Sequence, residues 1–357
     1  MQPISLKTRS SQARTRSGII ATAVVIPLAA FSISCSSTPG QAISDAGADV
    51  ALINPSFAWS PAAPCPTPRF EANGVFVAEE LWVMGGFVSK QLDVTNAVDI
   101  YDPATDAWRV GPALPAAQTH MGVVNVGDDV LVVGGFRGTF ASARAPAVAD
   151  VWRWRGINAV WSPGPSLPKA TAAFAWGLVG SVLHIAGGLG ADGGTDTSAH
   201  LVWDLAGADA WVGAPPLPNP RNHGGGAVVD GLFYAIAGRH DWNEAAGDQM
   251  DVNAFDPSTG LWSPRAPIPI ARSEIGASTS AMFDGRILVV GGSLASIRPS
   301  ADVLIYDPSV DMWSRLPALP EPRKGTVAVR VGPRIVVTTG SPTSIDPSGT
   351  TWVGCCL

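Results

Sequence analysis

The segment Leu81-Trp82-Val83-Met84-Gly85-Gly86 decides the fold, because an apolar run ending in two small residues returns five more times along the chain. The later runs end at Gly135, Gly188, Gly238, Gly292 and Gly340, and the fourth and sixth copies replace the first glycine with Ala237 and Thr339. Short apolar runs bounded by glycine are typical of buried strands. A period of about fifty residues predicts one structural unit repeated six times.

A second series follows each apolar run and ends in tryptophan. It reads Ile100-Tyr101-Asp102-Pro103 to Trp108 in the first copy and Ile345-Asp346-Pro347 to Trp352 in the last. The copies between them run from Trp154 to Trp161, Trp203 to Trp211, Phe255 to Trp262 and Tyr306 to Trp313. Asp-Pro suits a turn, because proline presets φ at its second position.

The two series together resemble the kelch repeat. The resemblance covers the range from Phe57 to Leu357 and implies an all-β fold: a six-bladed kelch-type β-propeller with four antiparallel strands per blade. The chain shows no sustained helical period, and its 39 Gly, 31 Pro and 15% charged residues agree with many short strands joined by tight turns. The glycine pairs and the repeated Trp residues are therefore interpreted as scaffold.

The first residues are interpreted as a targeting segment. Basic residues at the start are followed by an apolar run from Gly18 to Phe31, which is too short for a membrane span and suits a secretory signal over residues 1–34. Ser32-Ile33-Ser34-Cys35 resembles the lipobox of bacterial lipoproteins, which implies lipidation of Cys35 and a flexible tether over residues 35–56. The alternative is ordinary cleavage nearby, with Cys35 lost or unmodified. Both interpretations predict export, to the cell envelope (periplasm or outer membrane) or the medium.

Charge excludes one class of partner. The whole chain carries a net charge of −6, and removal of residues 1–34 takes away four basic and no acidic residues, which leaves −10. An acidic surface argues against nucleic acid, whose binding depends on Lys and Arg.

Both ends of the repeat region are candidates for closing the ring. Ala58-Trp59-Ser60 looks like the end of a repeat without its beginning, but Thr351-Trp352-Val353 offers the same strand from the other terminus. If the termini meet, Cys65 and either Cys355 or Cys356 are expected to form a disulfide, which export permits. A bond between Cys355 and Cys356 is the rival.

The loops that enter each blade are expected to face the channel mouth. Aligning the copies predicts one ring of equivalent positions, made of Glu71, His120, Thr171, His223, Glu274 and Gly325. The neighbouring column predicts a second ring, made of Arg69, Gln118, Lys169, Arg221, Arg272 and Arg323. Such rings could transfer protons or hold a carboxylate. The plainer alternative is that polar residues line a wet channel and the arginines pair with the backbone.

A second candidate surface is the loop Arg239-His240-Asp241-Trp242-Asn243, whose composition suits protein or carbohydrate contact. His184 lies inside an apolar strand and is expected to be a core histidine. We expect no metal and no cofactor.

Two functions from different classes follow. The first is a binding module, monomeric and tethered to the envelope by lipid only, for a protein or glycan partner. The alternative is a sugar-acting enzyme similar to the sialic acid mutarotases, with Glu274, His223 and Glu71 as its acid–base groups.

Overall fold

The computed structural model describes residues 44–46, 50–54, 56–138, 140, 145–156, 160–207, 209–241, 247–275, 280–295 and 297–355. The predicted signal segment, Cys35, Trp242 and Cys356 lie outside these ranges. All described residues belong to one compact unit, Cys35–Leu357.

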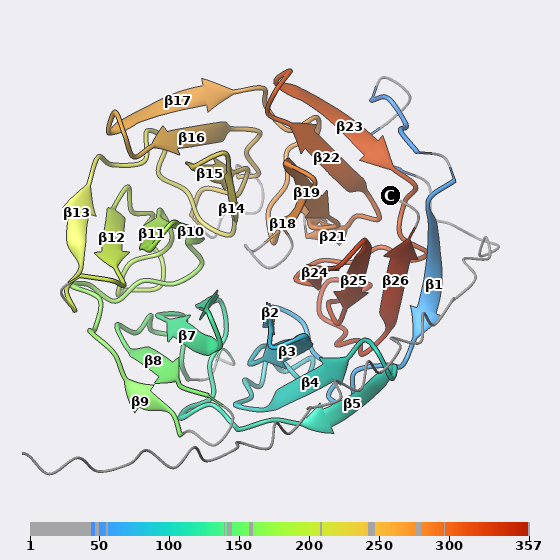
Figure 1. Ribbon diagram of the computed structural model, residues 1–357, viewed down its shortest axis with the longest axis horizontal. Coiled ribbons are helices and arrows are strands. Elements are labelled where there is room, and N and C mark those ends of the chain that lie inside the picture. The colour runs from blue at the N-terminus through green and yellow to red at the C-terminus, as the bar shows by residue number, and fades with distance from the viewer. Residues whose placement is uncertain are drawn as a thin grey trace, which may run out of the picture. The chain divides into compact units, whose positions relative to one another are not determined.

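Six four-stranded antiparallel sheets surround a central axis (Figure 1), which confirms the predicted six-bladed β-propeller. The first blade holds β2 (Asn73–Val77), β3 (Glu80–Met84), β4 (Val98–Asp102) and β5 (Ala107–Val110). The second holds β6 (Gly122–Val126), β7 (Asp129–Val133), β8 (Val151–Trp154) and β9 (Ser162–Pro163). The third holds β10 (Ala175–Val179), β11 (Val182–Ala186), β12 (His200–Asp204) and β13 (Val212–Ala214).

The second half continues the same order. The fourth blade holds β14 (Gly225–Val229), β15 (Leu232–Ile236), β16 (Val252–Asp256) and β17 (Leu261–Arg265). The fifth holds β18 (Ser280–Phe283), β19 (Arg286–Val290), β22 (Val303–Asp307) and β23 (Met312–Leu316), with a small hairpin of β20 (Ser293–Leu294) and β21 (Arg298–Pro299). The sixth holds β24 (Val327–Val331), β25 (Arg334–Thr338), β26 (Thr351–Cys355) and β1 (Ala58–Ala62). Within the described ranges, no helix is long and apolar enough to cross a membrane.

The glycine pairs follow the second strand of each blade, where neighbouring blades come closest. Gly85 and Gly86 have φ of +64° and +90°. A Cβ at Gly85 would lie 2.4 Å from the carbonyl oxygen of Gln118 in the next blade, and one at Gly86 would lie 2.7 Å from that of Phe70. Positive φ and close approach both favour glycine, which agrees with the interpretation of these pairs as scaffold.

Tryptophans on the outer side join each blade to the one before it. The indole N–H of Trp108 donates to the carbonyl of Ala63 at 2.7 Å, and that of Trp313 donates to Ala266 at 2.9 Å. The same bond occurs around the ring from Trp161 to Pro112, Trp211 to Pro165, Trp262 to Pro215 and Trp59 to Pro317. These six bonds form a closed outer belt, which accounts for the recurrence of Trp at this position.

The two termini share the sixth blade. β1 pairs with β26, and Trp59 lies opposite Gly354 as Trp108 lies opposite Tyr101 in the first blade. The last member of the second series was therefore assigned wrongly. Trp352 lies in the third strand of its blade, not the fourth, because the N-terminal β1 supplies the outer strand and the last repeat ends one strand early.

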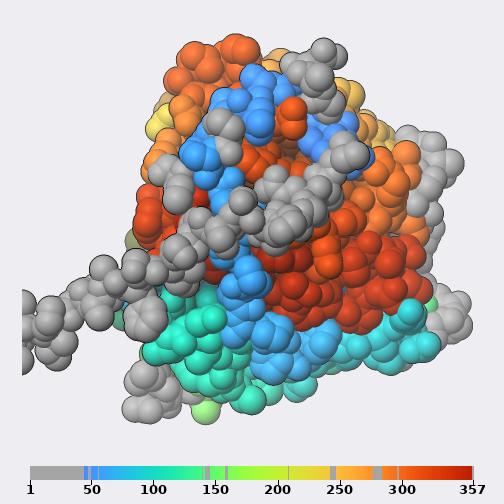
Figure 2. Space-filling model, turned by 90° about the vertical axis from the view of Figure 1, so that its right-hand side faces the viewer, coloured from blue at the N-terminus to red at the C-terminus, as the bar shows by residue number. Residues whose placement is uncertain are grey.

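Residues before β1 are tied to the fifth blade, so the predicted tether over residues 35–56 extends too far. The Ser44 hydroxyl and the backbone N–H of Asp45 both donate to one carboxylate oxygen of Asp302 at 2.7 Å. The Ile53 N–H donates to the carbonyl of Arg315 in β23 at 2.9 Å. Figure 2 shows this N-terminal segment lying across the C-terminal blades. The buried Asp302 carboxylate needs these donors, which explains why the segment is held.

The predicted disulfide from Cys65 to Cys355 or Cys356 is wrong, because Cys65 carries a free, buried thiol. The register explains the difference. Cys355 lies opposite Ala58 at one end of the β1–β26 ladder, whereas the N–H of Cys65 bonds to the carbonyl of Gly349 beyond the other end. Cys355 is itself disulfide-bonded, and Cys356 lies outside the described residues.

Replacing Trp59 with alanine tests the closure. The side chain is buried and its indole bonds across the blade boundary, so W59A is expected to lower the free energy of unfolding by about 3–5 kcal/mol. Urea unfolding followed by Trp fluorescence measures the loss. Val110 on β5 is 83% exposed, so V110A is the control, with a change within about 0.5 kcal/mol. Equal effects from the two substitutions would contradict the closure.

Candidate functional site

One left-handed residue per blade forms the inner ring around the axis. These residues have φ between +51° and +56°, and they are Glu71, His120, Ala173, His223, Glu274 and Gly325. The sequence alignment placed Thr171 in this ring, which is wrong by two residues. The spacing shows why: Leu167 precedes Ala173 by six residues, as Leu217 precedes His223. Pro168 therefore corresponds to Pro218 and not to Pro220, from which the position of the ring was counted.

Hydrogen bonds between blades close this inner ring. The N–H of Glu71 donates to the carbonyl of Gly325 at 2.9 Å, and the N–H of Gly325 donates to that of Glu274 at 3.1 Å. The circuit continues from Ile275 to His223, from His223 to Ala173 and from Ala173 to His120. The hydroxyl of Thr119 completes it by donating to the carbonyl of Glu71 at 2.8 Å. These bonds hold five non-glycine residues in a conformation that such residues rarely adopt.

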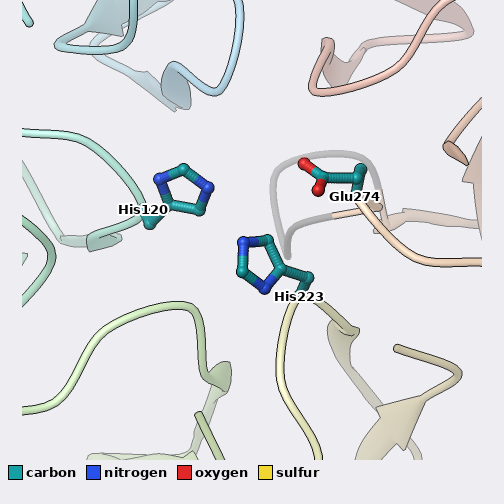
Figure 3. A group of neighbouring side chains, drawn as sticks. All are labelled: His120, His223 and Glu274. Atoms are coloured by element: carbon teal, nitrogen blue, oxygen red, sulfur yellow. The ribbon is translucent and has the colours of Figure 1, made fainter. Parts of the chain in front are cut away.

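Four polar side chains of the inner ring meet at the axis. Figure 3 shows His120 and His223 facing each other, with Glu274 beside them. The imidazole centroids of the two histidines are 4.8 Å apart and nearly perpendicular. Glu71 approaches from the first blade, with a carboxyl oxygen 3.6 Å from Nε2 of His120. We call Glu71, His120, His223 and Glu274, with Arg239 and Lys324, the axial cluster.

The predicted second ring does not form at the mouth, because its arginines turn into the blades. Arg69 donates to the carbonyls of Gly85 and Ala97, and Arg221 donates to those of Ala235 and Ala237. Arg272 pairs with Asp302 at 2.7 Å, with both side chains fully buried. The third-blade position equivalent to these arginines is Thr171, not Lys169. The four side chains serve as scaffold, as the plainer alternative predicted: Arg69, Arg221, Arg272 and Arg323.

Arg239 belongs to the axial cluster rather than to an exposed loop. It follows Gly238, its side chain is buried, and its Nη1 lies 2.9 Å from a carboxylate oxygen of Glu274. Its neighbour His240 lies nearer the surface, with Nδ1 3.4 Å from the Asp196 carboxylate. The two candidate surfaces predicted from the sequence therefore meet at the same end of the axis, although Trp242 lies outside the described residues.

Hydrogen-bond logic assigns the tautomer of His223. The Asp196 carboxylate can only accept, so the amide nitrogen of Asn222 must face it, and the two atoms are 2.5 Å apart. The amide oxygen of Asn222 then faces Nδ1 of His223, which must carry the proton. Nε2 of this neutral ring is left as an acceptor, and a guanidinium nitrogen of Arg239 lies 3.3 Å from it.

The same logic applies to His120. The Thr119 hydroxyl gives its hydrogen to the carbonyl of Glu71, so it can only accept from Nδ1 of His120, 3.0 Å away. Nε2 of His120 is therefore also unprotonated, and it faces the Glu71 carboxyl. Two imidazole acceptors thus point into the axial cluster.

Burial and neighbouring charges decide which groups of the axial cluster are protonated. Burial lowers the pKa of His120 to about 4 and holds the pKa of His223 well below its ordinary value, so both rings are neutral at pH 7. Burial and the nearby Glu274 raise the pKa of Glu71. Burial would raise the pKa of Glu274 too, but Arg239, Lys324 and His223 outweigh it and hold that pKa well below its ordinary value. Glu71 is the acid of the pair and Glu274 the carboxylate.

The donor atoms of His120, His223 and Glu274 lie within 4.8 Å of one another, a set that could hold a metal ion. However, the Arg239 guanidinium already contacts both Glu274 and His223. A metal would have to displace this fixed positive charge, so the set fits a metal poorly.

A cavity of about 150 Å³ opens above the cluster and forms the mouth. Its floor is the axial cluster, and its wall is largely apolar, formed by Phe70, Phe87, Leu92, Phe140, Ile297 and Ile345 together with Ser344. The prediction from the sequence did not include Lys324, Asn222 or Asp196. The column directly before the inner ring contains Lys324 and Asn222, so an alignment shifted by one position would have found both.

Away from the axis, His184 and His200 form a second buried pair. The carbonyl of Pro215 can only accept, so Nδ1 of His200 carries the proton and its Nε2 accepts from Nδ1 of His184, 3.0 Å away. Burial lowers the pKa of each ring to about 4. The rings pack against Phe233 and Phe255 of the fourth blade, which agrees with the core role expected for His184.

Comparison with known proteins agrees with the fold. A kelch motif matches residues 68–115 and 277–320. Kelch-like protein terF of Aspergillus terreus is 26% identical over 301 residues, which cover 76% of this chain and 61% of that protein. Human Kelch-like protein 34 is 30% identical over 244 residues, which cover 65% of this chain and 36% of that protein. Rat Kelch-like protein 36 is 26% identical over 254 residues, which cover 70% of this chain and 40% of that protein. The chain thus matches less than two thirds of the length of each relative. With the six-bladed architecture, these matches define a kelch-repeat β-propeller.

The tautomers can be tested by long-range ¹H–¹⁵N NMR of the imidazoles. We expect His120, His184, His200 and His223 to be neutral and protonated on Nδ1 at pH 6, because each Nδ1 faces an acceptor. The variant N222A is the control: without the amide oxygen, Nδ1 of His223 loses its acceptor, so the tautomer of that ring alone should change. An Nε2–H tautomer at His120 or His223 would contradict the assignment.

The same burial predicts loss of stability in acid. The folded-state pKa of these imidazoles lies below the unfolded value of about 6.5. Their contribution to the free energy of unfolding is therefore complete above pH 6.5 and is lost as the pH falls towards 4. For each imidazole with a folded pKa of about 4, the free energy of unfolding should fall by about 3 kcal/mol by pH 4. The raised pKa of Glu71 acts in the opposite sense. Urea unfolding from pH 7 to pH 4.5 measures the slope, which E71Q should steepen; a flat profile would refute the prediction.

Proposed function

We propose that this kelch propeller is an interaction module that binds a protein partner at the axial mouth. The observation that carries the proposal is the mouth itself: a cavity of about 150 Å³ with an apolar, partly aromatic wall and a buried charged floor. Binding energy in protein interfaces concentrates where a few side chains fill such a pocket and exclude water. A propeller fold supports many functions, so the site and not the fold argues for this one.

The arrangement favours a protein over a glycan as partner. In the floor, Arg239 pairs with Glu274 and both imidazole Nδ1 atoms have acceptors, so Lys324 is the cation left to meet a polar group of a partner. The wall presents three phenylalanines and a single hydroxyl, that of Ser344, whereas a sugar ring needs several amide and hydroxyl groups around its edge. A single side chain or a chain end of a partner fits these conditions better.

We also propose that the module is exported and held at the cell envelope through a lipidated Cys35. The basic start, the short apolar run and the motif ending at Cys35 support this location. Mass spectrometry of the mature N-terminus and membrane fractionation of C35S would test it.

A second candidate, the acid–base sugar enzyme, is favoured by one observation. The protonated Glu71 lies next to the unprotonated Nε2 of His120, so a proton donor and an acceptor stand side by side. In this case the full chain should accelerate anomer exchange of an acidic sugar in an NMR assay, and E71Q should abolish the effect. Absence of any acceleration by the unaltered chain would remove this candidate.

The interaction proposal predicts a position-dependent photocrosslink. With a photoreactive phenylalanine derivative at Ile345, on the mouth wall, the full-length chain in its native cells should give one discrete protein adduct. The same group at Val110, on the outer edge, is the matched control and should give none. The adduct should disappear in R239A, which disturbs the floor. An adduct from Val110 alone would move the partner to the outer face, and glycan binding without any adduct would favour a sugar ligand.

A further inference from the structure

Lys324 is a buried cation at the mouth that forms no ion pair with the described residues. It precedes the inner-ring residue Gly325, and its backbone is fixed by two hydrogen bonds with Ser341, of 3.1 and 2.9 Å. The residue is only 5% exposed and lines the mouth cavity. Within the described part of the chain, no acidic side chain lies within 4.0 Å of its ammonium group. Arg239, by contrast, is paired with Glu274.

The charges of the axial cluster leave one positive charge over. Arg239 offsets Glu274, Glu71 keeps its proton, and the rings of His120 and His223 are neutral. The ammonium of Lys324 is then uncompensated. A buried charge without a partner is costly, so the folded protein gains from an anion that enters the cavity.

Glu71 supplies a second group with an unsatisfied atom. Its Oε1 is buried and has no hydrogen-bond partner among the described residues. This oxygen lies 2.4 Å from the place that a Cβ of Gly325 would take, so the missing side chain of Gly325 makes room for it. The protonated Glu71 carboxyl also bonds to Glu274, so an incoming carboxylate would take over this hydrogen bond from Glu274.

We propose that the mouth binds a carboxylate, with one oxygen on the Lys324 ammonium and the other accepting a hydrogen bond from the Glu71 carboxyl. A single surplus positive charge matches a monoanion, whereas a phosphate dianion would leave excess negative charge beside Glu274. The cavity of about 150 Å³ is small, and Phe87 and Phe140 line its wall. The carboxylate is therefore carried on a short apolar or aromatic group.

Either a free small acid or the acidic side chain or C-terminus of a protein partner presents this chemistry. The inference deepens the proposed function and rests on it only where the carboxylate comes from a protein. The choice between sources is made by experiment.

The test measures binding of benzoate, propionate, benzamide and inorganic phosphate to the full chain by calorimetry. Benzoate and propionate should bind, benzamide, which lacks the charge, at least tenfold more weakly, and phosphate no better than benzamide. K324M should weaken benzoate binding at least tenfold. R109M, which removes an exposed cation from the outer strand β5, should leave it unchanged. Equal binding of benzoate and benzamide, or full affinity in K324M, would overturn the proposal.

K324M also gives a result without any ligand. If the ammonium is uncompensated, its removal should raise the melting temperature of the free protein, whereas K324R, which keeps the charge, should retain benzoate binding. A clear fall in the melting temperature of K324M would mean that Lys324 has a structural anionic partner and would refute the surplus charge.

Competition separates this proposal from the proposed function. Benzoate should suppress the Ile345 photocrosslink if the partner inserts a carboxylate. Benzoate binding without any adduct would leave the anion site standing and remove the protein partner. An adduct that persists in K324M and is indifferent to benzoate would leave the partner standing and remove the anion site.

Discussion

The hydrogen bonds between blades are the constraint on which this structure depends. A propeller blade cannot bury both faces of its sheet alone, so each must be fastened to two neighbours. Here the fastening occurs twice: at the axis, through the inner ring of left-handed residues, and at the rim, through indole N–H groups that reach the preceding blade. The outer circuit closes through β1, because the chain's first strand completes its last blade, and the inner circuit closes through the bond from Glu71 to Gly325.

The inner circuit explains why chemistry gathers at the axis. The positive φ of each ring residue aims its side chain at the centre, and the backbone bonds hold it there whatever that side chain is. Ala173 and Gly325 show that small residues satisfy the geometry. Glu71, His120, His223 and Glu274 instead place ionisable groups in a buried site, which costs desolvation. The scaffold tolerates this cost because hydrogen bonds between the six blades hold the ring in place. The cluster is therefore a feature added to the fold and is not required by it.

The sequence predicted the members of the inner ring better than their surroundings. Five of its six positions were right, since the repeat is regular enough to align by eye. Thr171 was wrong because the position was counted from Pro168, which corresponds to Pro218 and lies two residues before the position of Pro220. The arginines two positions earlier were expected at the mouth but turn inward, because each finds backbone carbonyls within its own blade. Lys324 was overlooked because a single lysine before a glycine carries no signal until its neighbours in space are known.

Periodicity by itself determined that one unit of short strands is repeated six times, because this depends on contacts that recur at a fixed spacing in the chain, and the resemblance to the kelch repeat implied the four-stranded blade. Only the tertiary structure decided which residues meet at the axis and which protons they hold. Asp196 orients Asn222, and Asn222 assigns the tautomer of His223, across 27 residues and two blades. The free thiol of Cys65 was likewise settled by the register of β1 on β26. Ionisation and pairing depend on burial and on neighbours brought together by ring closure, and no repeat in the sequence encodes either one.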